Sequence, residues 1–259
     1  MAAAELTLQD VYVAAFTARC AAMRREGQEL LDEPGIRGLL PTAEAPLARL
    51  LITDDRPHPT LAALLPELSA GMVKVLATAE QCADLLRGAP AWRVTPLTAM
   101  VCRDLERVPE LTLPAELTFR PVRRLAGDDP AGVPLAAAVD TVMHADPSLA
   151  GHSAQELDGF LRALPAPFRL FAAVEAGGAV RATSGAGAFG AQADVLFVNT
   201  DHGWRGRGIA RAMTAAALAD ARARGASRAC LDATDAAASI YGHLGFAVVS
   251  PLTQFYRAG

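Results

Sequence analysis

The sequence predicts an α/β protein, in which a mixed central β-sheet flanked by helices is preceded by a smaller α/β domain. Apolar runs of strand length alternate with segments of helical periodicity along the 259 residues. Hydrophobic residues make up 52% of the chain, which is enough to fill a core and argues against global disorder. Two strand–helix–strand segments also share a sequence pattern, which indicates a duplicated unit.

The first half of the chain is expected to open with a helix over 8–31. Val11, Ala15 and Cys20 recur there at helical spacing, and Pro34-Gly35 ends the pattern. The elements expected next are a strand at 48–53, a helix at 60–65, a strand at 72–77, a helix at 79–88 and a strand at 92–103. The segment 104–116 has two prolines and little periodicity, so we interpret it as a linker between domains 1–110 and 111–259.

The second half is expected to alternate strands and helices from Leu117 onward. Its predicted strands are 117–121, 168–175, 178–188, 193–199 and 227–232, with a strand pair over 246–258. Its predicted helices are 131–144, 153–164, 207–224 and 235–243. The glycines of "EAGGAV" predict a hairpin turn between two of these strands.

An internal repeat links the two halves. "ATAEQCADLL" at 77–86 aligns with "ATDAAASIYG" at 233–242, and "VTPLT" at 94–98 aligns with "VSPLT" at 249–253. Each copy is predicted as strand, helix and strand in the same order. The repeat therefore predicts a structural duplication.

The bulk properties exclude several classes of partner. A formal net charge of −4 gives no indication of nucleic acid or a lipid surface. The four dispersed cysteines lack metal-ligand or CxxC spacing, so we expect buried thiols and no metal site. No secretory signal is evident, and no apolar run reaches about 18 residues. We therefore predict a cytoplasmic protein that does not contact membranes.

The stretch "GWRGRGIARAM" at 203–213 follows an apolar strand and opens an alanine-rich helix. It lacks the Gly-Lys-Ser/Thr of a phosphate-binding P-loop and the third glycine of a dinucleotide fingerprint. A helix amino terminus has unpaired N–H groups and a partial positive charge, and glycines allow a ligand close to them. Arg205 and Arg207 add charge nearby. This junction predicts an anion-binding cradle.

Tyr241 lies in "ASIYGHLGF", near the end of a short predicted helix. A phenol keeps its proton at neutral pH, since its ordinary pKa is about 10, and it can donate that proton to a leaving thiolate. The alternative is a tyrosine of the core whose hydroxyl finds one partner. The residue alone does not decide between the two interpretations.

Together these segments resemble the GNAT superfamily of acyl-CoA N-acyltransferases. Arg205-x-x-Gly208-x-Ala210 matches its R/Q-x-x-G-x-G/A signature, and "ATDAAASIYGHLGF" is similar to its later tyrosine segment. The resemblance covers roughly residues 117–259. It implies a GNAT fold, acetyl-CoA as co-substrate and Tyr241 as the general acid. It further implies coenzyme contacts from Phe197, Val198, Asn199, Arg205, Gly206, Arg207, Gly208, Ile209, Ala210 and, more weakly, Thr234.

The sequence departs from the family pattern in two respects. Thr234 stands where many relatives have an asparagine. The strand before the loop offers only Asp194 as a base, with Asp201 and His202 just after it. His202 has the better intrinsic pKa, although an exposed loop histidine is the more common case. We therefore leave the general base unassigned.

The first half resembles a degenerate GNAT-like copy. Leu85 stands where Tyr241 stands in the second copy, and it has no proton to donate. The loop "DDRPHPTL" has no glycine, two prolines without N–H groups (Pro57 and Pro59) and the acidic pair Asp54-Asp55. This half is expected to be non-catalytic, with a structural role or a share in the acceptor groove.

The expected acceptor is a primary amine, carried by a small molecule or a peptide. The helices that line the acceptor cleft in the family carry Asp140, His144, Asp146 and His152 here, and acidic groups suit a cationic amine. Ser153 and Glu156 match a capping box, so polar residues of this region also have a structural interpretation. The acyl chain and a homodimer are left open. The alternative function is a non-catalytic module that binds acyl-CoA or a protein partner.

Overall fold

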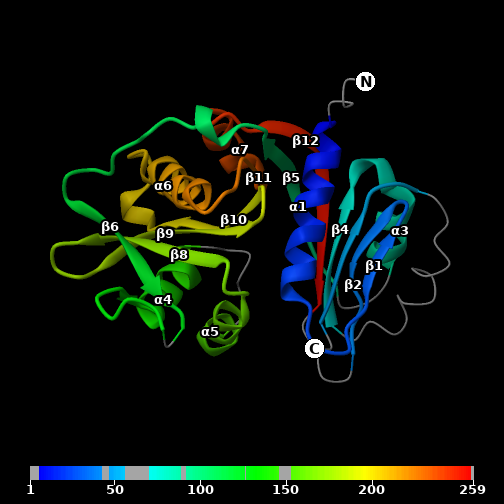
Figure 1. Ribbon diagram of the computed structural model, residues 1–259, viewed down its shortest axis with the longest axis horizontal. Coiled ribbons are helices and arrows are strands. Elements are labelled where there is room, and N and C mark those ends of the chain that lie inside the picture. Colours follow the sequence, from blue (N-terminus) through cyan, green and yellow to red (C-terminus); the bar gives the residue numbers. More distant parts are fainter. Residues whose placement is uncertain are drawn as a thin grey trace. The chain divides into compact units, whose positions relative to one another are not determined.

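The computed structural model describes residues 6–42, 47–55, 70–88, 92–125, 127–145 and 153–257 (Figure 1). The contacts of the chain divide it into two compact units. The first unit comprises Met1–Val101, Asp232–Ala238 and Ala247–Gly259, and the second comprises Cys102–Leu231 and Ser239–Phe246. The units therefore interleave along the chain. That the segments 1–110 and 111–259 are separate functional domains stays a prediction.

The sheet of the first unit takes its strands from both ends of the chain. Its order is β1-β2-β3-β4-β12-β5. Pairing is antiparallel except between β3 and β4, which are parallel. The strands are β1 (Leu30–Glu33), β2 (Ile36–Leu39), β3 (Leu47–Ile52), β4 (Ala70–Leu76), β5 (Arg93–Cys102) and β12 (Ala247–Arg257). The carboxyl-terminal strand is thus an inner strand of the amino-terminal sheet.

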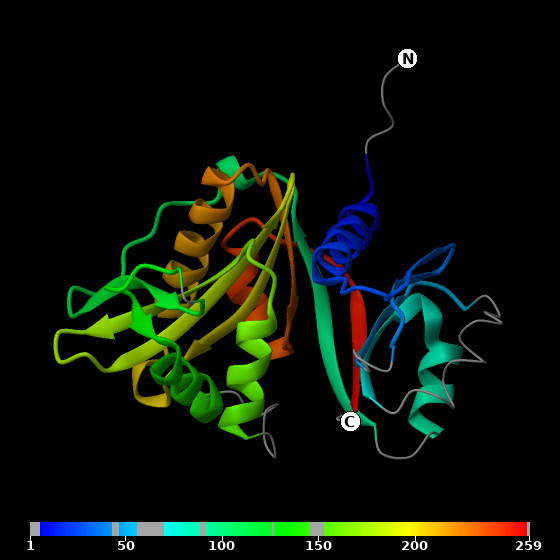
Figure 2. The same cartoon turned by 60° about the horizontal axis from the view of Figure 1, so that its bottom comes forward.

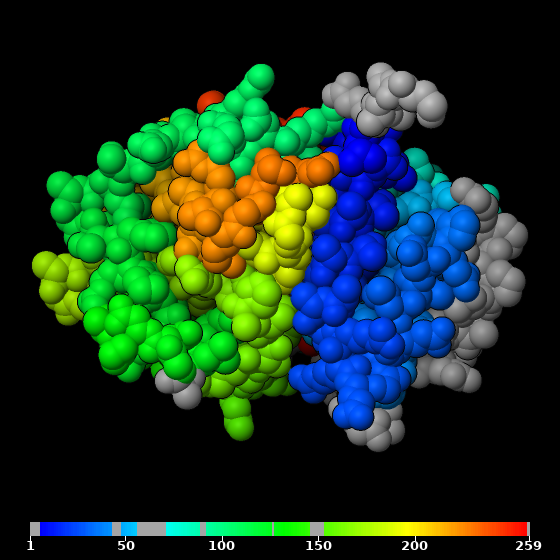
Figure 3. Space-filling model, in the orientation of Figure 1, coloured from blue at the N-terminus to red at the C-terminus, as the bar shows by residue number. Residues whose placement is uncertain are grey.

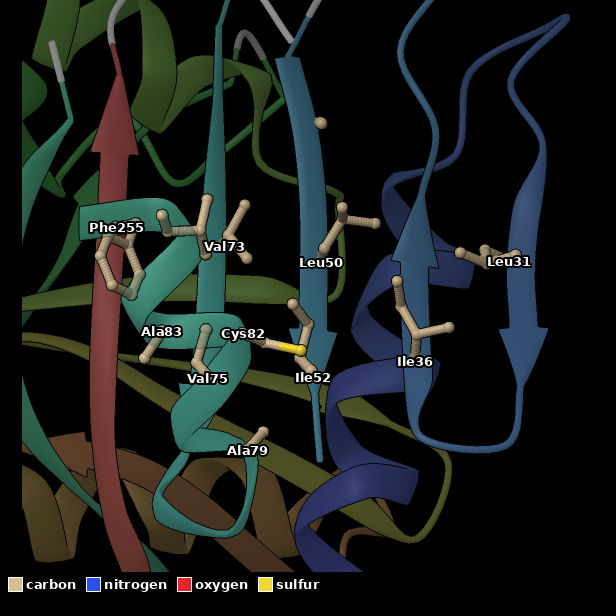
Figure 4. Packing of buried hydrophobic residues seen from close by; sticks show 12 residues of the cluster. Leu31, Ile36, Leu50, Ile52, Val73, Val75, Ala79, Cys82, Ala83 and Phe255 are labelled. Carbon is tan, nitrogen blue, oxygen red and sulfur yellow. The ribbon is translucent and has the colours of Figure 1, made fainter. Parts of the chain in front are cut away.

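Two helices cover opposite faces of this sheet (Figure 4). Helix α3 (Glu80–Gly88) packs Cys82, Ala83 and Leu86 on one face, against apolar strand residues that alternate toward it. Helix α1 (Leu8–Met23) begins at a capping box and covers the other face. The core between α3 and the sheet includes Leu50, Ile52, Val73, Val75 and Phe255, all of them 1% exposed or less.

The sheet of the second unit has the order β11-β10-β9-β8-β6-β7. The pairs β10–β11 and β6–β7 are parallel, whereas β6, β8, β9 and β10 pair antiparallel. The strands are β6 (Leu117–Arg123), β7 (Val133–Pro134), β8 (Phe168–Glu175), β9 (Val180–Phe189), β10 (Gln192–Thr200) and β11 (Arg228–Ala233). Both sheets are mixed and carry helices, which confirms the predicted α/β class.

Helices lie on both faces of this second sheet (Figures 1 and 2). Helix α6 covers one face, and α4 and α5 cover the other. Their bounds are α4 (Leu135–Ala145), α5 (Ala154–Ala163) and α6 (Ile209–Ala223), and a short helix α7 (Asp235–Gly242) follows β11. The Ser153–Glu156 capping box at the start of α5 is confirmed, since each residue bonds the other's backbone N–H.

Most predicted elements are present, and two expectations are wrong. The helix expected over 8–31 ends at Met23, and a β1–β2 hairpin turns at Gly35, whose φ of 84° favours glycine. The strand pair expected over 246–258 is one strand with a register shift between Val248 and Ser250. The helix expected at 60–65 lies outside the described residues, as do Pro57 and Pro59.

The remaining structural observations concern membranes, thiols and metals. None of the described helices is long and apolar enough to cross a membrane. All four cysteines are buried free thiols, as expected. Within the described ranges, no group of three or more His, Cys, Asp or Glu side chains is placed to hold a metal ion.

Candidate functional site

Strand β10 contains a bulge in the segment expected to contact the coenzyme. The pairing of β10 with β9 shifts between Leu196↔Gly185 and Asn199↔Thr183, so β10 has one extra residue there. Phe197 lies in the bulge with φ of 55°, a left-handed conformation that no other non-glycine residue of the described chain adopts. Phe197 and Val198 are partly exposed, whereas Asn199 is buried. The bulge therefore turns backbone of this strand out of the regular ladder.

Three neighbours hold the bulge in place. The Thr183 hydroxyl donates to the Phe197 carbonyl at 2.9 Å. The Phe197 ring packs edge-on against Phe160 of α5 and Phe168 of β8, at centroid distances of 6.0 and 6.2 Å. A Cβ on Gly185 would lie 2.4 Å from the Phe168 ring, so only glycine fits beneath that ring. The strained conformation is thus fixed by long-range contacts.

Strands β10 and β11 separate just before the bulge. Their parallel pairing consists of Gln192↔Arg228, Ala193↔Ala229 and Asp194↔Cys230, and it ends there although β10 continues to Thr200. Backbone groups of the later β10 residues on this side are therefore not used by the ladder. They are available to an extended ligand, as unpaired backbone groups require a partner.

The loop after β10 places a row of unused donors at the start of α6. Gly206 and Gly208 have φ of 76° and 75°, and Gly208 is the amino-terminal cap of the helix. Within the described chain, the N–H groups of residues 206–211 donate to no protein acceptor. A Cβ at Gly206 would meet no atom within 4 Å. The loop is exposed, and orange atoms of helix α6, which follows it, reach the surface in Figure 3. The unused N–H groups of this loop and helix start are therefore suited to bind an anion.

The arginines of the loop have separate structural partners. Arg205 donates to the carbonyls of Thr200 (3.1 Å) and Ala145 (2.8 Å). Arg207 pairs with Glu116 at 2.8 Å and lies over the Trp204 ring at 4.4 Å. These contacts fix the shape of the loop, while the backbone provides the donors.

Arg211 is a cation near the start of α6 that was not among the expected coenzyme contacts. Its guanidinium lies 4.0 Å from the position of a Cβ on Gly208 and has no hydrogen-bond partner in the described chain. Arg211 follows the capping Gly208 by three residues. This helical spacing brings the two together and can be read from the sequence.

Tyr241 is buried in α7, with 6% of its surface exposed. Its ring packs edge-on against Phe246 at 6.1 Å. Its hydroxyl has no protein partner among the described residues. The hydroxyl oxygen is not fully enclosed, so solvent can reach it. Burial raises the pKa of Tyr241 to about 12. The phenol is therefore protonated at neutral pH and has a hydrogen to donate.

The other expected polar residues are used in different ways. The Thr234 carbonyl accepts from the N–H groups of Ala237 and Ala238, at 2.9 and 3.0 Å, as α7 begins. Asp201 accepts from the Gly203 N–H at 3.3 Å and pairs with Arg181 at 3.0 Å. Asp194 is 4% exposed and lies in the paired part of β10. The contacts of Asp201 therefore hold the loop, Asp194 is buried in the sheet, and His202 is exposed.

The corresponding segment of the first unit lacks this geometry. β3 and β4 stay paired from Leu47↔Ala70 to Ile52↔Val75, so these parallel strands do not separate. Leu85 is 65% exposed, whereas Tyr241 is buried. The Asp55 carboxylate accepts from the Gln81 N–H at 2.9 Å, and so caps the start of α3.

The predicted acceptor residues divide into two groups. Asp140 and His144 lie one turn apart on α4 and line a surface groove of about 610 Å³ that Asp158 of α5 also lines. The His144 Nδ1 atom is 3.4 Å from the Asp140 carboxylate. Asp146 and His152 lie outside the described residues.

Known proteins share this architecture. Residues 166–259 match the family model of the acetyltransferase (GNAT) domain. A GCN5-related N-acetyltransferase from Kribbella flavida is 18% identical, with a TM-score of 0.62 over 96% of each chain. A GCN5-related N-acetyltransferase-like protein from Streptococcus suis 89/1591 is 16% identical, with a TM-score of 0.53 over 89% of this chain and 88% of its own. A tandem GNAT protein from the clavulanic acid biosynthesis pathway is 18% identical, with a TM-score of 0.51 over 85% and 77%. A comparison with curated protein sequences finds no match.

The domain match and the shared fold support an acyltransferase activity. Residues 166–259 match the acetyltransferase (GNAT) domain, and the chain as a whole shares the fold of these GNAT structures.

Proposed function

We propose that the protein transfers an acetyl group from acetyl-CoA to a primary amine by direct attack in a ternary complex. The observation that carries this proposal is the row of unused N–H groups at 206–211, which lies at the start of a helix and includes two glycines with positive φ. Such donors suit the diphosphate of coenzyme A. The separation of β10 and β11 supports a slot for the pantetheine arm beside them.

The reaction needs few side chains once both substrates are aligned. The ammonium form first loses a proton to water, and the neutral amine attacks the thioester carbonyl. A C–N bond forms, the C–S bond breaks, and the nitrogen releases its second proton to water. Backbone N–H groups of the Phe197–Asn199 bulge are proposed to stabilise the oxyanion. Tyr241 donates its phenolic proton to the leaving thiolate and recovers one from solvent. Because burial raises the pKa of Tyr241, the phenol stays protonated until the thiolate leaves.

The acceptor is proposed to be a cationic amine drawn from solution as its ammonium form. Asp140 and His144 in the α4–α5 groove support this choice, because a carboxylate attracts a positive charge. A small molecule or a peptide amino terminus fits this chemistry equally well.

A thiol-release assay with acetyl-CoA tests the proposal across small amines, amino acids, aminoglycosides and peptide amino termini. We expect turnover with at least one class. Tyr241→Phe should lower kcat by about 10²–10⁴-fold, the usual contribution of a general acid. It should leave the coenzyme A affinity unchanged, because the hydroxyl is not part of the cradle.

Two outcomes would count against the assignment. Coenzyme A binding without turnover on any amine would support a non-catalytic acyl-CoA-binding module. Full activity of Tyr241→Phe would remove the tyrosine from the mechanism while leaving the fold and the cradle intact.

A further inference from the structure

A buried polar network of the first unit lies at the end of β11. The Tyr12 hydroxyl of α1 donates to one oxygen of the Asp232 carboxylate at 2.6 Å, and Lys74 of β4 pairs with the other oxygen. Tyr12 and Lys74 are 2% and 3% exposed, and the Asp232 side chain is 12% exposed. The three residues come from distant parts of the sequence and meet on a single carboxylate.

The charges of this network are satisfied. Burial opposes ionisation of Asp232, but Lys74, Tyr12 and Arg19 together hold the pKa of Asp232 below its ordinary value. A buried ion pair adds little stability, because the loss of hydration offsets the attraction between the charges. Apolar side chains could therefore fill this space equally well, whereas two donors on one carboxylate fix where its strand ends.

Asp232 lies immediately before helix α7. The pairing of β11 with β10 ends two residues before Asp232. The Thr234 carbonyl, two residues after Asp232, accepts the first backbone hydrogen bonds of α7. This helix has 8 residues, and so short a helix depends on tertiary contacts to keep its place. The network at Asp232 therefore fixes the point from which α7 starts.

Tyr241 lies at the other end of the same helix. Its carbonyl accepts from the N–H groups of Leu244 and Phe246, at 2.9 and 3.1 Å, as α7 ends. The helix has about two turns and connects Asp232 to Tyr241 as one hydrogen-bonded element. A shift at its start would therefore move the phenol.

The internal repeat provides a comparison. The segment 77–86 follows Leu76 in the first copy, whereas the equivalent segment 233–242 follows Asp232 in the second. Leu76 is apolar and 1% exposed. The first copy also has Leu85 at the position of Tyr241. The buried carboxylate thus occurs in the copy that has the phenol and is absent from the copy that lacks it.

We propose that Asp232, fixed by Lys74 and Tyr12, is a positioning residue for Tyr241. The network fixes the start of α7, and the helix holds the phenol where it donates its proton. This inference rests on the proposed function, in which Tyr241 is the proton donor.

Two variants of the full chain test the proposal. Tyr12→Phe removes the hydroxyl that bonds Asp232, and the double variant Lys74→Met/Asp232→Leu replaces the ion pair with apolar side chains. We expect kcat to fall several-fold in Tyr12→Phe and about 10- to 100-fold in the double variant, because a small displacement of a catalytic group is costly. The KM for acetyl-CoA should not change, since the cradle lies on α6.

Two further measurements separate positioning from a general structural role. In the Tyr241→Phe background, both sets of substitutions should have little additional effect on kcat, because the group that they position is already lost. Hydrogen exchange of the α7 amides, measured without substrate, should be faster in both variants than in the wild type.

Matched controls change the same kinds of group elsewhere. Tyr256→Phe removes a phenolic hydroxyl from the same face of the sheet, since Tyr256 is paired with Met72, two residues from Lys74. Asp84→Leu/Arg87→Met removes an exposed ion pair of α3. Both controls should keep the kcat and the α7 exchange of the wild type.

The outcomes distinguish this inference from the proposed function. If Tyr241→Phe is defective but Tyr12→Phe and the double variant keep full kcat, the positioning role alone is overturned. An equal loss of kcat in the wild-type and Tyr241→Phe backgrounds, or unchanged exchange of the α7 amides, also overturns it. Full activity of Tyr241→Phe overturns the acid assignment itself and the positioning role with it.

Discussion

Burial of Tyr241 favours the protonated form that the proposed mechanism requires. A phenol in water has a pKa of about 10. In the fold, burial raises the pKa of Tyr241 to about 12, because the phenolate is the form that loses hydration. The phenol is therefore protonated at neutral pH, and its hydroxyl has no protein partner among the described residues that would compete for the proton.

The pH dependence of kcat follows from this shift. Since the pKa is raised, the acid form persists as pH rises, and kcat should not fall between about pH 8 and 10 through loss of the Tyr241 proton. Steady-state kinetics with saturating amine would measure this. A falling limb with an apparent pKa in that range, absent from Tyr241→Phe, would contradict the assignment.

At the scale of elements, the site depends on how β10 leaves its neighbours. It bulges away from β9 at Phe197 and separates from β11 after Asp194. The equivalent parallel pair of the first unit, β3 and β4, does neither. The difference between the copies is therefore a difference in strand pairing as well as in side chains.

Thr183→Val should weaken this bulge. The variant keeps the shape of the side chain but leaves the Phe197 carbonyl without its donor, at a cost of about 1–3 kcal/mol in unfolding free energy. We expect coenzyme A binding to weaken as well. Urea denaturation and calorimetry would measure the two effects, with the exposed Thr118→Val of β6 as a matched control. Equal behaviour of the two variants would show that the hydroxyl does not support the bulge.

The sequence was sufficient for elements whose signal is local. The glycine pattern at 203–208 predicted the loop before α6, and the alanine-rich periodicity predicted the helix. The β1–β2 hairpin was missed because its short strands follow a helical pattern without interruption. β12 was expected as a pair of strands but is one strand that contains Pro251. This proline lies beside a bulge and just before pairing with β4 begins at Leu252, where its missing N–H is tolerated.

The contacts that shape the site were not predictable in this way. Thr183 and Gly185 meet the bulge only through the antiparallel pairing of β9 with β10, and Phe160 reaches it from a separate helix. No local pattern marks such partners. Tyr241 was identified because its motif resembles a family, whereas its burial and its raised pKa required the fold.

At the scale of the whole molecule, the amino-terminal unit depends on the end of the chain. β12 lies between β4 and β5 and contributes Phe255, which is 0% exposed, to the core of that unit. Without it, β4 and β5 would have no partner between them, and the core would lose a fully buried aromatic side chain.

A fragment of residues 1–110 should therefore fail to fold by itself. We expect a circular dichroism spectrum without cooperative melting, and recovery of structure when a peptide of residues 246–257 is added. The control is the same peptide with Phe255→Ala, which should rescue less. A fragment that melts cooperatively without the peptide would show that the unit is an autonomous domain.

The central claim is that the N–H groups at the start of α6 bind the diphosphate of coenzyme A. The most direct measurement is calorimetric titration of coenzyme A into Gly208→Glu, with Gly203→Glu as the control. Glutamate at 208 places bulk and negative charge at the cap of the helix, whereas Gly203 lies in the same loop with open space around it. We predict that binding is abolished in Gly208→Glu and weakened only modestly in Gly203→Glu. Undiminished affinity of Gly208→Glu would contradict the account.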